Sequence, residues 1–489
     1  MTVTAYTLDN LRIEASRQLD PGKRGALGQY MTPAPIASFM ASLFAHRGNA
    51  RLLDAGAGIG SLASAFLNKA MEADGTVDID AWEIDATLRH YLKNTLESHK
   101  QRVQGRIKTH IHATDFIEDA VFEIQMGCGK RYTHAILNPP YSKIKVDSRH
   151  RRLLRMVGIE TVNLYTAFAA LASLLLEKDG ELVAITPRSF CNGPYYRPFR
   201  ELILRTCALR QLHLFESRSK AFQDDEILQE SVISHWVKGA TQTRVVISTS
   251  HDANFDDYKK TDFDAAAIVK PDDGERFIHI PTTYEQAHTP ELCAHALHDI
   301  GLEVCTGPVV DFRLKDYWRE EPSEDTAPLL YAHHFAEGCL RWPKPHHKKP
   351  NALQVCSAVN KWLMPRGYYV LVKRFSAKEQ RRRVVAYALD PAELNAPNIG
   401  FENHWNVFHA NKQGLDGDIA KGLAIFLNSS LFDTHFRSFS GHTQVNATDL
   451  RAMKYPSPEQ LRKLGRLAGQ ERLCDQAAID RLTQELRHQ

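Results

Sequence analysis

The run Asn138-Pro139-Pro140-Tyr141 combines residue types that can act together on a nitrogen nucleophile. It ends the segment 133–141, which is apolar before it breaks at the two prolines and therefore predicts a buried strand followed by a rigid turn. Such a turn can aim the Asn138 side-chain oxygen and the Pro139 carbonyl oxygen at one point. Tyr141 adds a ring on which a planar group can stack.

An amino group on an aromatic base is a poor nucleophile because its lone pair is delocalised into the ring. Two acceptors that bind its two hydrogens favour a pyramidal nitrogen and free the lone pair for attack, which is preorganised electrostatic stabilisation. The alternative interpretation is a purely structural strand-to-loop turn, which is the more common role of a Pro-Pro pair. Three features upstream, each at the end of another predicted strand, favour the chemical interpretation.

The first feature is a glycine-rich turn, Asp54-Ala55-Gly56-Ala57-Gly58-Ile59-Gly60, between a predicted strand at 51–55 and a predicted helix at 61–73. Glycines let the backbone approach a ligand closely, and the helix N-terminus offers free N–H groups. The spacing G-x-G-x-G differs from the dinucleotide-binding G-x-G-x-x-G. Asp54 would repel a pyrophosphate, so the turn favours a cofactor that carries an amino-acid group.

The other two features are acidic residues at strand ends. Glu83 closes the alternating segment 77–85, where a carboxylate can accept hydrogen bonds from both ribose hydroxyls. Asp115 and Phe116 close the segment 106–116, where a carboxylate can bind an adenine amino group while the ring stacks on the base. Each acid could instead face solvent in a loop. Together with the glycine turn they predict a nucleoside cofactor.

The strands that carry these residues alternate with helices. Alternating strands and helices predict βαβ units, a mostly parallel sheet and an α/β fold, in which ligands bind at the carboxyl ends of the strands. Strands are expected at 51–55, 77–85, 106–116, 133–141, 181–187, 209–217 and 231–239, and helices at 61–73 and 163–178.

These motifs, in this order, resemble the gamma-class N6-adenine DNA methyltransferases of bacterial type II restriction–modification systems, and among them the PstI- and XhoI-like modification enzymes. The similar segments, which span nearly the whole chain, are 28–40, 52–62, 81–85, 113–116, 138–141, 187–200, 215–233, 307–313 and 427–450. The resemblance implies a Rossmann-like S-adenosylmethionine-dependent methyltransferase domain, followed by a mixed α/β target-recognition domain.

The resemblance also implies a role for each matched residue. The methionine part of S-adenosylmethionine is wrapped by Tyr30, Thr32 and Pro33 and rests on Asp54, Ala55, Gly56 and Gly58. Its ribose and adenine are contacted by Glu83, Asp115 and Phe116. The target adenine, flipped out of the duplex, meets Asn138, Pro139, Pro140 and Tyr141, and a second aromatic, Phe222, packs on it.

The second half of the chain is expected to recognise DNA. A polar stretch at 247–266 predicts a linker, so we expect a catalytic domain at 1–245 and a recognition domain at 246–489. Residues 341–383 hold twelve Lys and Arg against one acid, and residues 143–155 hold six against one. Clustered cations are typical of a phosphate-binding face, with Lys143 and Arg381 as candidate contacts; the alternative is a solvated surface.

Composition excludes several other classes. The 489 residues contain no apolar stretch long enough for a membrane span, and the eight cysteines form no CxxC pair, which argues against a zinc site or a disulfide framework. No signal peptide is apparent, so a cytoplasmic enzyme without a metal is expected. Its expected partners are double-stranded DNA and a cognate restriction endonuclease that acts separately.

Two alternatives remain open. Methyltransferases of rRNA or of protein glutamine also use Asn-Pro-Pro-Tyr, because amide and base amino groups share the same weak nucleophilicity. The N-terminal position of the segment 28–40 and the long second half favour DNA over both. A catalytically silent DNA-binding protein is the third possibility, and the intact run at 138–141 argues against it.

Overall fold

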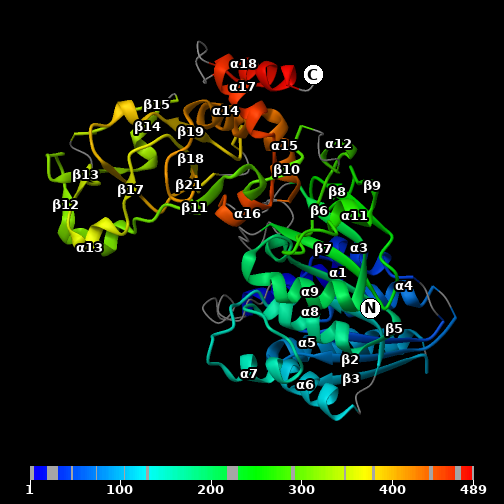
Figure 1. Cartoon of the computed structure of the whole chain (residues 1–489). Coiled ribbons are helices and arrows are strands. Elements are labelled where there is room, and N and C mark those ends of the chain that lie inside the picture. The colour runs from blue at the N-terminus through cyan, green and yellow to red at the C-terminus, as the bar shows by residue number, and fades with distance from the viewer. Residues whose placement is uncertain are drawn as a thin grey trace. The chain divides into compact units, whose positions relative to one another are not determined.

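The chain divides into two compact units, Met1–Tyr284 and Glu285–Gln489, each described here by itself (Figure 1). The computed structural model describes residues 5–18, 31–45, 48–72, 74–103, 105–127, 131–216, 230–287, 292–336, 338–345, 348–376, 380–439, 444–468 and 475–486.

The first unit is built on a nine-stranded sheet with the order β3-β2-β1-β4-β5-β7-β6-β8-β9. The strands are β1 (Ala50–Ala55), β2 (Val77–Trp82), β3 (Ile107–His112), β4 (Tyr132–Leu137), β5 (Leu176–Pro187), β6 (Cys207–Phe215), β7 (Ser231–Lys238), β8 (Arg244–Ser250) and β9 (Lys259–Asp264). Strands β1 to β5 pair in parallel, whereas β7 runs antiparallel to both β5 and β6. The predicted α/β fold class is confirmed, and the seven expected strands are β1 to β7.

Two of the longer helices of the first unit precede β1, and the others lie between the strands from β1 to β6, the alternation that the sequence predicts. These helices are α1 (Ala5–Gln18), α3 (Ala34–Ser42), α4 (Ser61–Ala70), α5 (Ala86–Arg102), α6 (Phe116–Met126), α7 (Arg149–Met156), α8 (Leu164–Leu175) and α9 (Arg197–Thr206). Strand β4 is buried along its whole length, as expected for a central parallel strand that is covered on both faces. The strand order reverses between β1 and β4, and in such sheets a ligand crevice forms at that reversal, outside the carboxyl ends.

The polar stretch at 247–266 is not the linker that we expected. It contains most of β8 and all of β9, which pair antiparallel and complete one edge of the first sheet. Val245, Ile247 and Phe263 are buried, and so are Ser248 and Ser250, whereas most polar residues of β9, such as Lys259 and Lys260, are exposed. An exposed edge hairpin with one polar face explains why the stretch reads as a linker.

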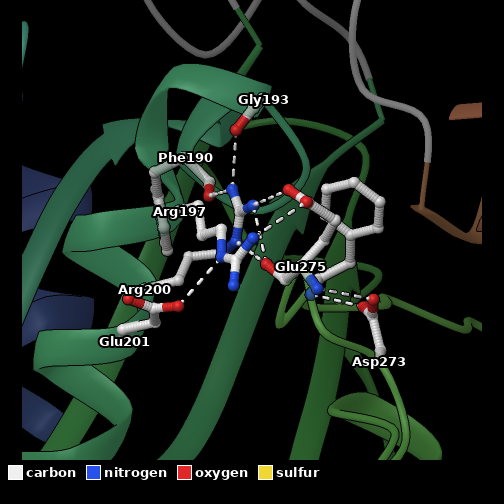
Figure 2. Close-up of polar contacts among 8 residues, drawn as sticks. Phe190, Gly193, Arg197, Arg200, Glu201, Asp273 and Glu275 are labelled. Carbon is white, nitrogen blue, oxygen red and sulfur yellow. Dashed lines mark hydrogen bonds and ion pairs between the residues drawn. The ribbon is translucent and has the colours of Figure 1, made fainter. Parts of the chain in front are cut away.

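The first unit therefore extends past residue 245, where the sequence analysis divided the chain. Figure 2 shows the contacts that fix this extension to α9. The guanidinium of Arg200, on α9, is fully buried and donates to the carbonyl oxygens of Phe190, Gly193 and Glu275 at 2.7–3.0 Å. Arg197 pairs with the Glu275 carboxylate at 3.3 Å. Residues 273–277 are thus fixed to α9, and the two compact units separate after Tyr284.

The second unit combines two larger sheets with a group of helices. An antiparallel sheet has the order β11-β21-β18-β19, and a mixed sheet the order β12-β16-β13-β20-β17. Their strands are β11 (Glu303–Thr306), β12 (Trp318–Arg319), β13 (Thr326–Leu330), β16 (Ala352–Gln354), β17 (Met364–Pro365), β18 (Tyr369–Lys373), β19 (Ala386–Leu389), β20 (Asn398–Phe401) and β21 (Trp405–His409). The main helices are α14 (Gly417–Asn428), α15 (Ser430–Phe439), α16 (Ala447–Ala452), α17 (Pro458–Leu467) and α18 (Gln476–Glu485).

Helices α14 and α17 pack unusually closely. A Cβ atom at Gly422 would lie 1.9 Å from the carbonyl oxygen of Leu461, and one at Gly465 would lie 1.9 Å from that of Asp418. Glycine is therefore required where the two helices touch. In the part of the chain that the structure describes, no helix is both long and apolar enough to cross a membrane.

Candidate functional site

A pocket opens at the carboxyl edge of the first sheet, where the strand order reverses. It gathers residues that follow β1, β2, β3 and β4, although these are spread over more than a hundred positions of the chain. The predicted site residues that line it are Thr32, Gly56, Gly58, Glu83, Asp115, Phe116, Asn138 and Pro140. The pocket is also lined by residues that the sequence analysis did not name, among them Met31, Ser61, Trp82, Ile84, His150 and Phe168.

The glycine-rich turn between β1 and α4 is held against the end of β2. Gly56, Gly58 and Gly60 have φ angles of 77°, 58° and 85°, in the left-handed region that favours glycine. The N–H groups of Gly56 and Ala57 both donate to the carbonyl oxygen of Trp82 at 2.9 Å. The turn therefore brings backbone to the pocket wall at positions where no side chain intervenes.

Glu83 lines the pocket with a carboxylate that the backbone already orients. Oε2 accepts the N–H of Gly58 at 2.9 Å, and Oε1 accepts the N–H of Asp85 at 2.8 Å. The side chain is buried, and burial raises the pKa of the Glu83 carboxyl. A fixed acceptor of this kind suits the ribose hydroxyls for which the sequence predicted it.

Asp54, the last residue but one of β1, is fully buried beside this turn. Among the described residues, no hydrogen bond of ordinary geometry reaches either carboxylate oxygen. Burial raises its pKa to about 7; the Glu83 charge raises it too, while the backbone N–H of Ala63 lowers it. Asp54 and Ala55 do not line the pocket. Two buried carboxyls make this end of the pocket a poor place for a pyrophosphate and a fitting one for a cofactor with positive charge.

Asp115 has two tasks in the structure. Its Oδ1 caps α6 by accepting the N–H groups of Ile117 and Glu118 at 2.8 and 3.3 Å, and its Oδ2 lies 2.9 Å from Nε2 of His150. Burial acts to raise the pKa of Asp115, but the hydrogen bonds, first that of His150, outweigh it and lower the pKa. The same hydrogen bond raises the pKa of His150.

His150 was missed because it lies inside the basic segment 143–155, which the sequence analysis treated only as a cluster of charges. It lies in the first turn of α7, which Ser148 caps by accepting the N–H of Arg151. A capping serine soon after the run 138–141 was the available signal, because it predicts that a helix begins close to the site.

Phe116 contributes an aromatic wall to the pocket. Its ring is buried and lies 5.4 Å from the ring of Trp82 and 5.0 Å from that of Phe168, measured between centroids. The indole N–H of Trp82 donates to Asp119 at 2.9 Å. The wall is therefore rigid, as a surface for a planar base requires.

The run 138–141 forms the turn at the end of β4. The Asn138 amide nitrogen donates to Oγ1 of Thr32 at 3.0 Å, and the hydroxyl of Tyr141 donates to Oδ1 of Asn138 at 3.2 Å. Pro140 lines the pocket, whereas Pro139 and Tyr141 do not. The Tyr141 ring lies 6.1 Å from that of Tyr165, edge to face. Asn138 thus presents a side chain whose orientation is set on both sides.

The remaining predicted contacts are spread out. Pro33 precedes α3, and its carbonyl oxygen accepts the N–H of Ala37. Lys143 and Arg381 are both exposed, in the first and second units respectively. Tyr30 and Phe222 lie outside the described residues.

The basic segment 341–383 is not uniformly a surface. Arg383 is 1% exposed; its backbone N–H donates to Asp433 at 2.6 Å and its guanidinium to the carbonyl oxygen of Ser376. Arg382 donates to the carbonyl oxygen of Asn428. Two of the three consecutive arginines thus hold the second unit together, and Arg381 alone of the three is exposed.

Comparison with known proteins gives the family. Residues 56–222, which include the three glycines of the turn and the run 138–141, match the Eco57I restriction-modification methylase family. The chain is 49% identical to the type II methyltransferase M.BsuBI of Bacillus subtilis, over 95% of this chain and 94% of that one. It is 42% identical to the type II methyltransferase M.PstI of Providencia stuartii, over 93% and 92% of the two chains.

Among solved structures, a DrdV–DNA complex shares the fold with a TM-score of 0.51 and 12% identity, over 95% of this chain and 59% of that one. M.BsuBI and M.PstI match this chain nearly end to end, so the similarity includes the second unit as well as the pocket. The chain belongs to the type II methyltransferases of restriction–modification systems.

Proposed function

We propose that the protein transfers a methyl group from S-adenosylmethionine to N6 of an adenine in a specific sequence of double-stranded DNA. The observation that carries the proposal is the placement of Asn138. Its amide nitrogen donates to Thr32, which orients its oxygen as the acceptor end, and Asn138 lines the pocket that Glu83 and Asp115 also line. A base amino group and a nucleoside cofactor are thus expected at two ends of one pocket.

The turn at 138–141 acts on the amino group of the target. An adenine inside a duplex cannot reach the turn, so it must rotate out of the stack, which costs a few kcal/mol. Asn138 Oδ1 accepts one N6 hydrogen and the Pro139 carbonyl oxygen accepts the other. As the nitrogen gains positive charge, both acceptors bind it more strongly than in the ground state, and this difference lowers the barrier.

Tyr141 serves the flipped base in two ways. Its ring offers a stacking surface that offsets part of the flipping cost. Its hydroxyl donates to Asn138 Oδ1, which keeps that oxygen oriented until the amino group arrives. We propose the same stacking role for Phe222.

S-adenosylmethionine supplies an electrophilic methyl group: the N–C bond to N6 forms as the sulfonium S–C bond breaks, S-adenosylhomocysteine is the leaving group, and N6 loses one proton to solvent. Glu83 is proposed to bind its ribose, Asp115 and Phe116 its adenine, and the glycine turn its amino-acid part. Tyr30, Thr32 and Pro33 are proposed to close over that part, and the buried charge of Asp54 and Glu83 favours a cation there. The chain's own contribution is to bind, orient and exclude water.

The two units are proposed to divide the work. The first carries the transfer site, and the second recognises the DNA sequence. The exposed side chains of Lys143, in the first unit, and Arg381, in the second, are the proposed phosphate contacts. A separate restriction endonuclease is the proposed partner, since M.BsuBI and M.PstI carry type II names. The cytoplasm is the proposed location.

The test uses the full-length protein, labelled S-adenosylmethionine and duplex DNA, with RNA and protein offered in parallel. Nucleosides from the product are separated, and label in N6-methyladenine is the expected result. Asn138→Ala should lower turnover by about a hundred- to a thousand-fold, as loss of one preorganised group does. Asn94→Ala, at an exposed position of α5, should not. Label in cytosine, RNA or glutamine would overturn the proposal, as would near-normal turnover of Asn138→Ala.

A further inference from the structure

Two buried carboxylates in the second unit each hold an exposed basic side chain. The first is Asp311, whose side chain is 6% exposed and whose Oδ2 lies 2.6 Å from Nζ of Lys349, a side chain that is 42% exposed. Tyr331 donates a second hydrogen bond to the same oxygen at 3.1 Å. Burial acts to raise the pKa of Asp311, but the hydrogen bonds from Lys349 and Tyr331 outweigh it and hold the pKa low.

The second carboxylate is Glu402, which is 1% exposed. Its partner is Nδ1 of His404 at 2.7 Å, and the His404 side chain is 52% exposed. The backbone N–H of His404 also donates to this carboxylate, at 2.9 Å. Burial raises the pKa of Glu402, although the hydrogen bonds and the charge of His404 act to lower it, and the charge of Asp311 adds to the rise.

The backbone of residues 307–309 holds the turn that carries His404 in place. The N–H of Asn403 donates to the carbonyl oxygen of Val309 at 2.9 Å, and the N–H of Val309 donates to that of Phe401 at 3.0 Å. A Cβ atom at Gly307 would lie 2.2 Å from the carbonyl oxygen of Glu402, so only glycine fits there. The turn is therefore positioned by backbone contacts as well as by the buried acid.

Aromatic and basic side chains flank this turn. The ring of Phe375 is 52% exposed and lies 5.1 Å from that of His404. The guanidinium of Arg374 donates to the carbonyl oxygen of Asn403 at 2.8 Å, beside the same ring. Next to Asp311, the ring of Phe312 is 59% exposed. We call the set Phe312, Lys349, Arg374, Phe375 and His404 the His404 surface.

We propose that the His404 surface contacts the DNA, with the His404 imidazole against a base edge in a groove and Lys349 on a phosphate. This inference rests on the proposed function, because it takes duplex DNA as the substrate. Burying a carboxylate is unfavourable unless it is paired, and a basic side chain in water needs no such partner. The buried Glu402, which fixes the imidazole of His404, therefore indicates a position where the direction of the ring matters.

Direction distinguishes a base contact from a phosphate contact. Phosphate attracts any nearby cation, whereas a base edge offers donors and acceptors at fixed positions. Because Nδ1 of His404 is bound to Glu402, Nε2 is the ring nitrogen left for a ligand, and its direction follows from the clamped turn. The exposed ring of Phe375 beside it suits apolar contact with a thymine methyl group.

The test compares full-length His404→Ala with His298→Ala, which removes another exposed histidine of the second unit that pairs with an acid, Asp299. Each is expressed in a host without adenine methylation, and the genomic DNA is sequenced for methylated adenines. Wild type and His298→Ala should mark one motif. His404→Ala should also mark sites that differ at one base pair, and the Kd ratio between the marked duplex and that variant should fall about tenfold. Glu402→Gln keeps the shape of the side chain that holds His404 and removes its charge. It should relax the specificity at the same base pair.

Salt dependence separates the two kinds of contact. Lys349→Gln should leave the motif unchanged and reduce the slope of log Kd against log salt by about 0.9. An unchanged motif and Kd ratio in His404→Ala would overturn the base-edge assignment. The assignment would also be overturned if His404→Ala bound all duplexes equally more weakly and its slope of log Kd against log salt were smaller. Failure of the proposed function is distinguishable from both, because the wild type itself would then mark no adenine.

Discussion

The amide nitrogen of Asn138 donates a hydrogen bond to the hydroxyl of Thr32 at 3.0 Å, across 106 positions of sequence. Thr32 is 3% exposed, so its hydroxyl is fixed in place. An amide can turn over and exchange its oxygen and nitrogen, and only one orientation leaves Oδ1 as an acceptor for an amino group. The segment before the glycine turn is thus proposed to orient the residue that acts on the target as well as to wrap the cofactor.

Thr32→Val is expected to lower kcat by about two- to tenfold, since one hydrogen bond contributes about 0.5–1.5 kcal/mol. Valine keeps the shape of threonine and removes only the hydroxyl. KM for the duplex should change little, because Thr32 acts through Asn138. Single-turnover methylation measures the effect, and Thr32→Ser, which restores the hydroxyl, should recover most of the rate. If Thr32→Val is as fast as the wild type, the hydrogen bond has no role in orienting the amide.

Asp54→Asn is expected to change how stability depends on pH. The pKa of Asp54 is raised by burial from 3.8 to about 7, so the folded protein binds a proton that the unfolded chain has lost. The favourable contribution of the neutral carboxyl is fully present below pH 3.8 and is lost as pH rises through about 7. At pH 8 Asp54→Asn should therefore unfold at a higher temperature than the wild type, and the difference should shrink toward pH 5.

Cofactor binding gives a second, independent measurement on Asp54→Asn. The same variant should bind S-adenosylmethionine more weakly, because it removes a negative charge close to where a cation is proposed. Calorimetry of the two proteins at pH 8 measures this. A variant that is no more stable at pH 8 than the wild type would mean that the buried carboxyl is already compensated in the folded protein.

Local pattern was enough for most of the first sheet. Strand β4 ends in an apolar run just before Asn138 and the two prolines, and the glycine turn follows a short apolar run, so both could be placed from neighbouring residues alone. The pairing of Asp115 with His150 could not. It depends on how the chain returns across α6, and nothing in the basic segment 143–155 distinguishes that histidine from the cations around it.

The second unit shows the same limit more strongly. Arg383 looks like its neighbours in a run of cations, yet it is buried, and only the distant Asp433 and the backbone of Ser376 explain why. The segment 247–266 was misread for the opposite reason, since an edge hairpin with a polar face has the composition of a linker. Composition identifies which segment of the sequence is basic. Packing decides which residues of that segment are exposed.

His150→Gln tests the link between α7 and the cofactor pocket. The pKa of His150 is raised by its hydrogen bond to Asp115, so the contribution of the pair to stability is present below the ordinary histidine pKa and is lost as pH rises through the raised value. The pKa of Asp115 is lowered, so the contribution is lost again as pH falls through that value. The wild type should therefore exceed His150→Gln in stability most clearly between about pH 4.5 and 6.

Thermal melts across this range measure the difference. Arg149→Gln is the matched control, because it removes the adjacent ion pair of α7 with Glu118 and leaves the hydrogen bond between His150 and Asp115 in place. Its effect should be nearly independent of pH between 6 and 9. A His150→Gln difference that stays constant from pH 5 to pH 9 would show that the imidazole is not charged in the folded protein.

Arg381→Gln should reduce the slope of log Kd for duplex DNA against log salt by about 0.9, because each phosphate that a cation neutralises releases condensed counterions. The single substitution is the sharper test, since Arg382 and Arg383 hold backbone carbonyls and their removal would alter the fold instead. Affinity should fall equally for the marked sequence and for unrelated duplexes, because a phosphate contact carries no sequence information. Lys69→Gln, which removes one positive charge from α4, is the charge-matched control and should leave the slope unchanged. An unchanged slope in Arg381→Gln would place that side chain away from the DNA, and a selective loss on the marked duplex would make it a base contact.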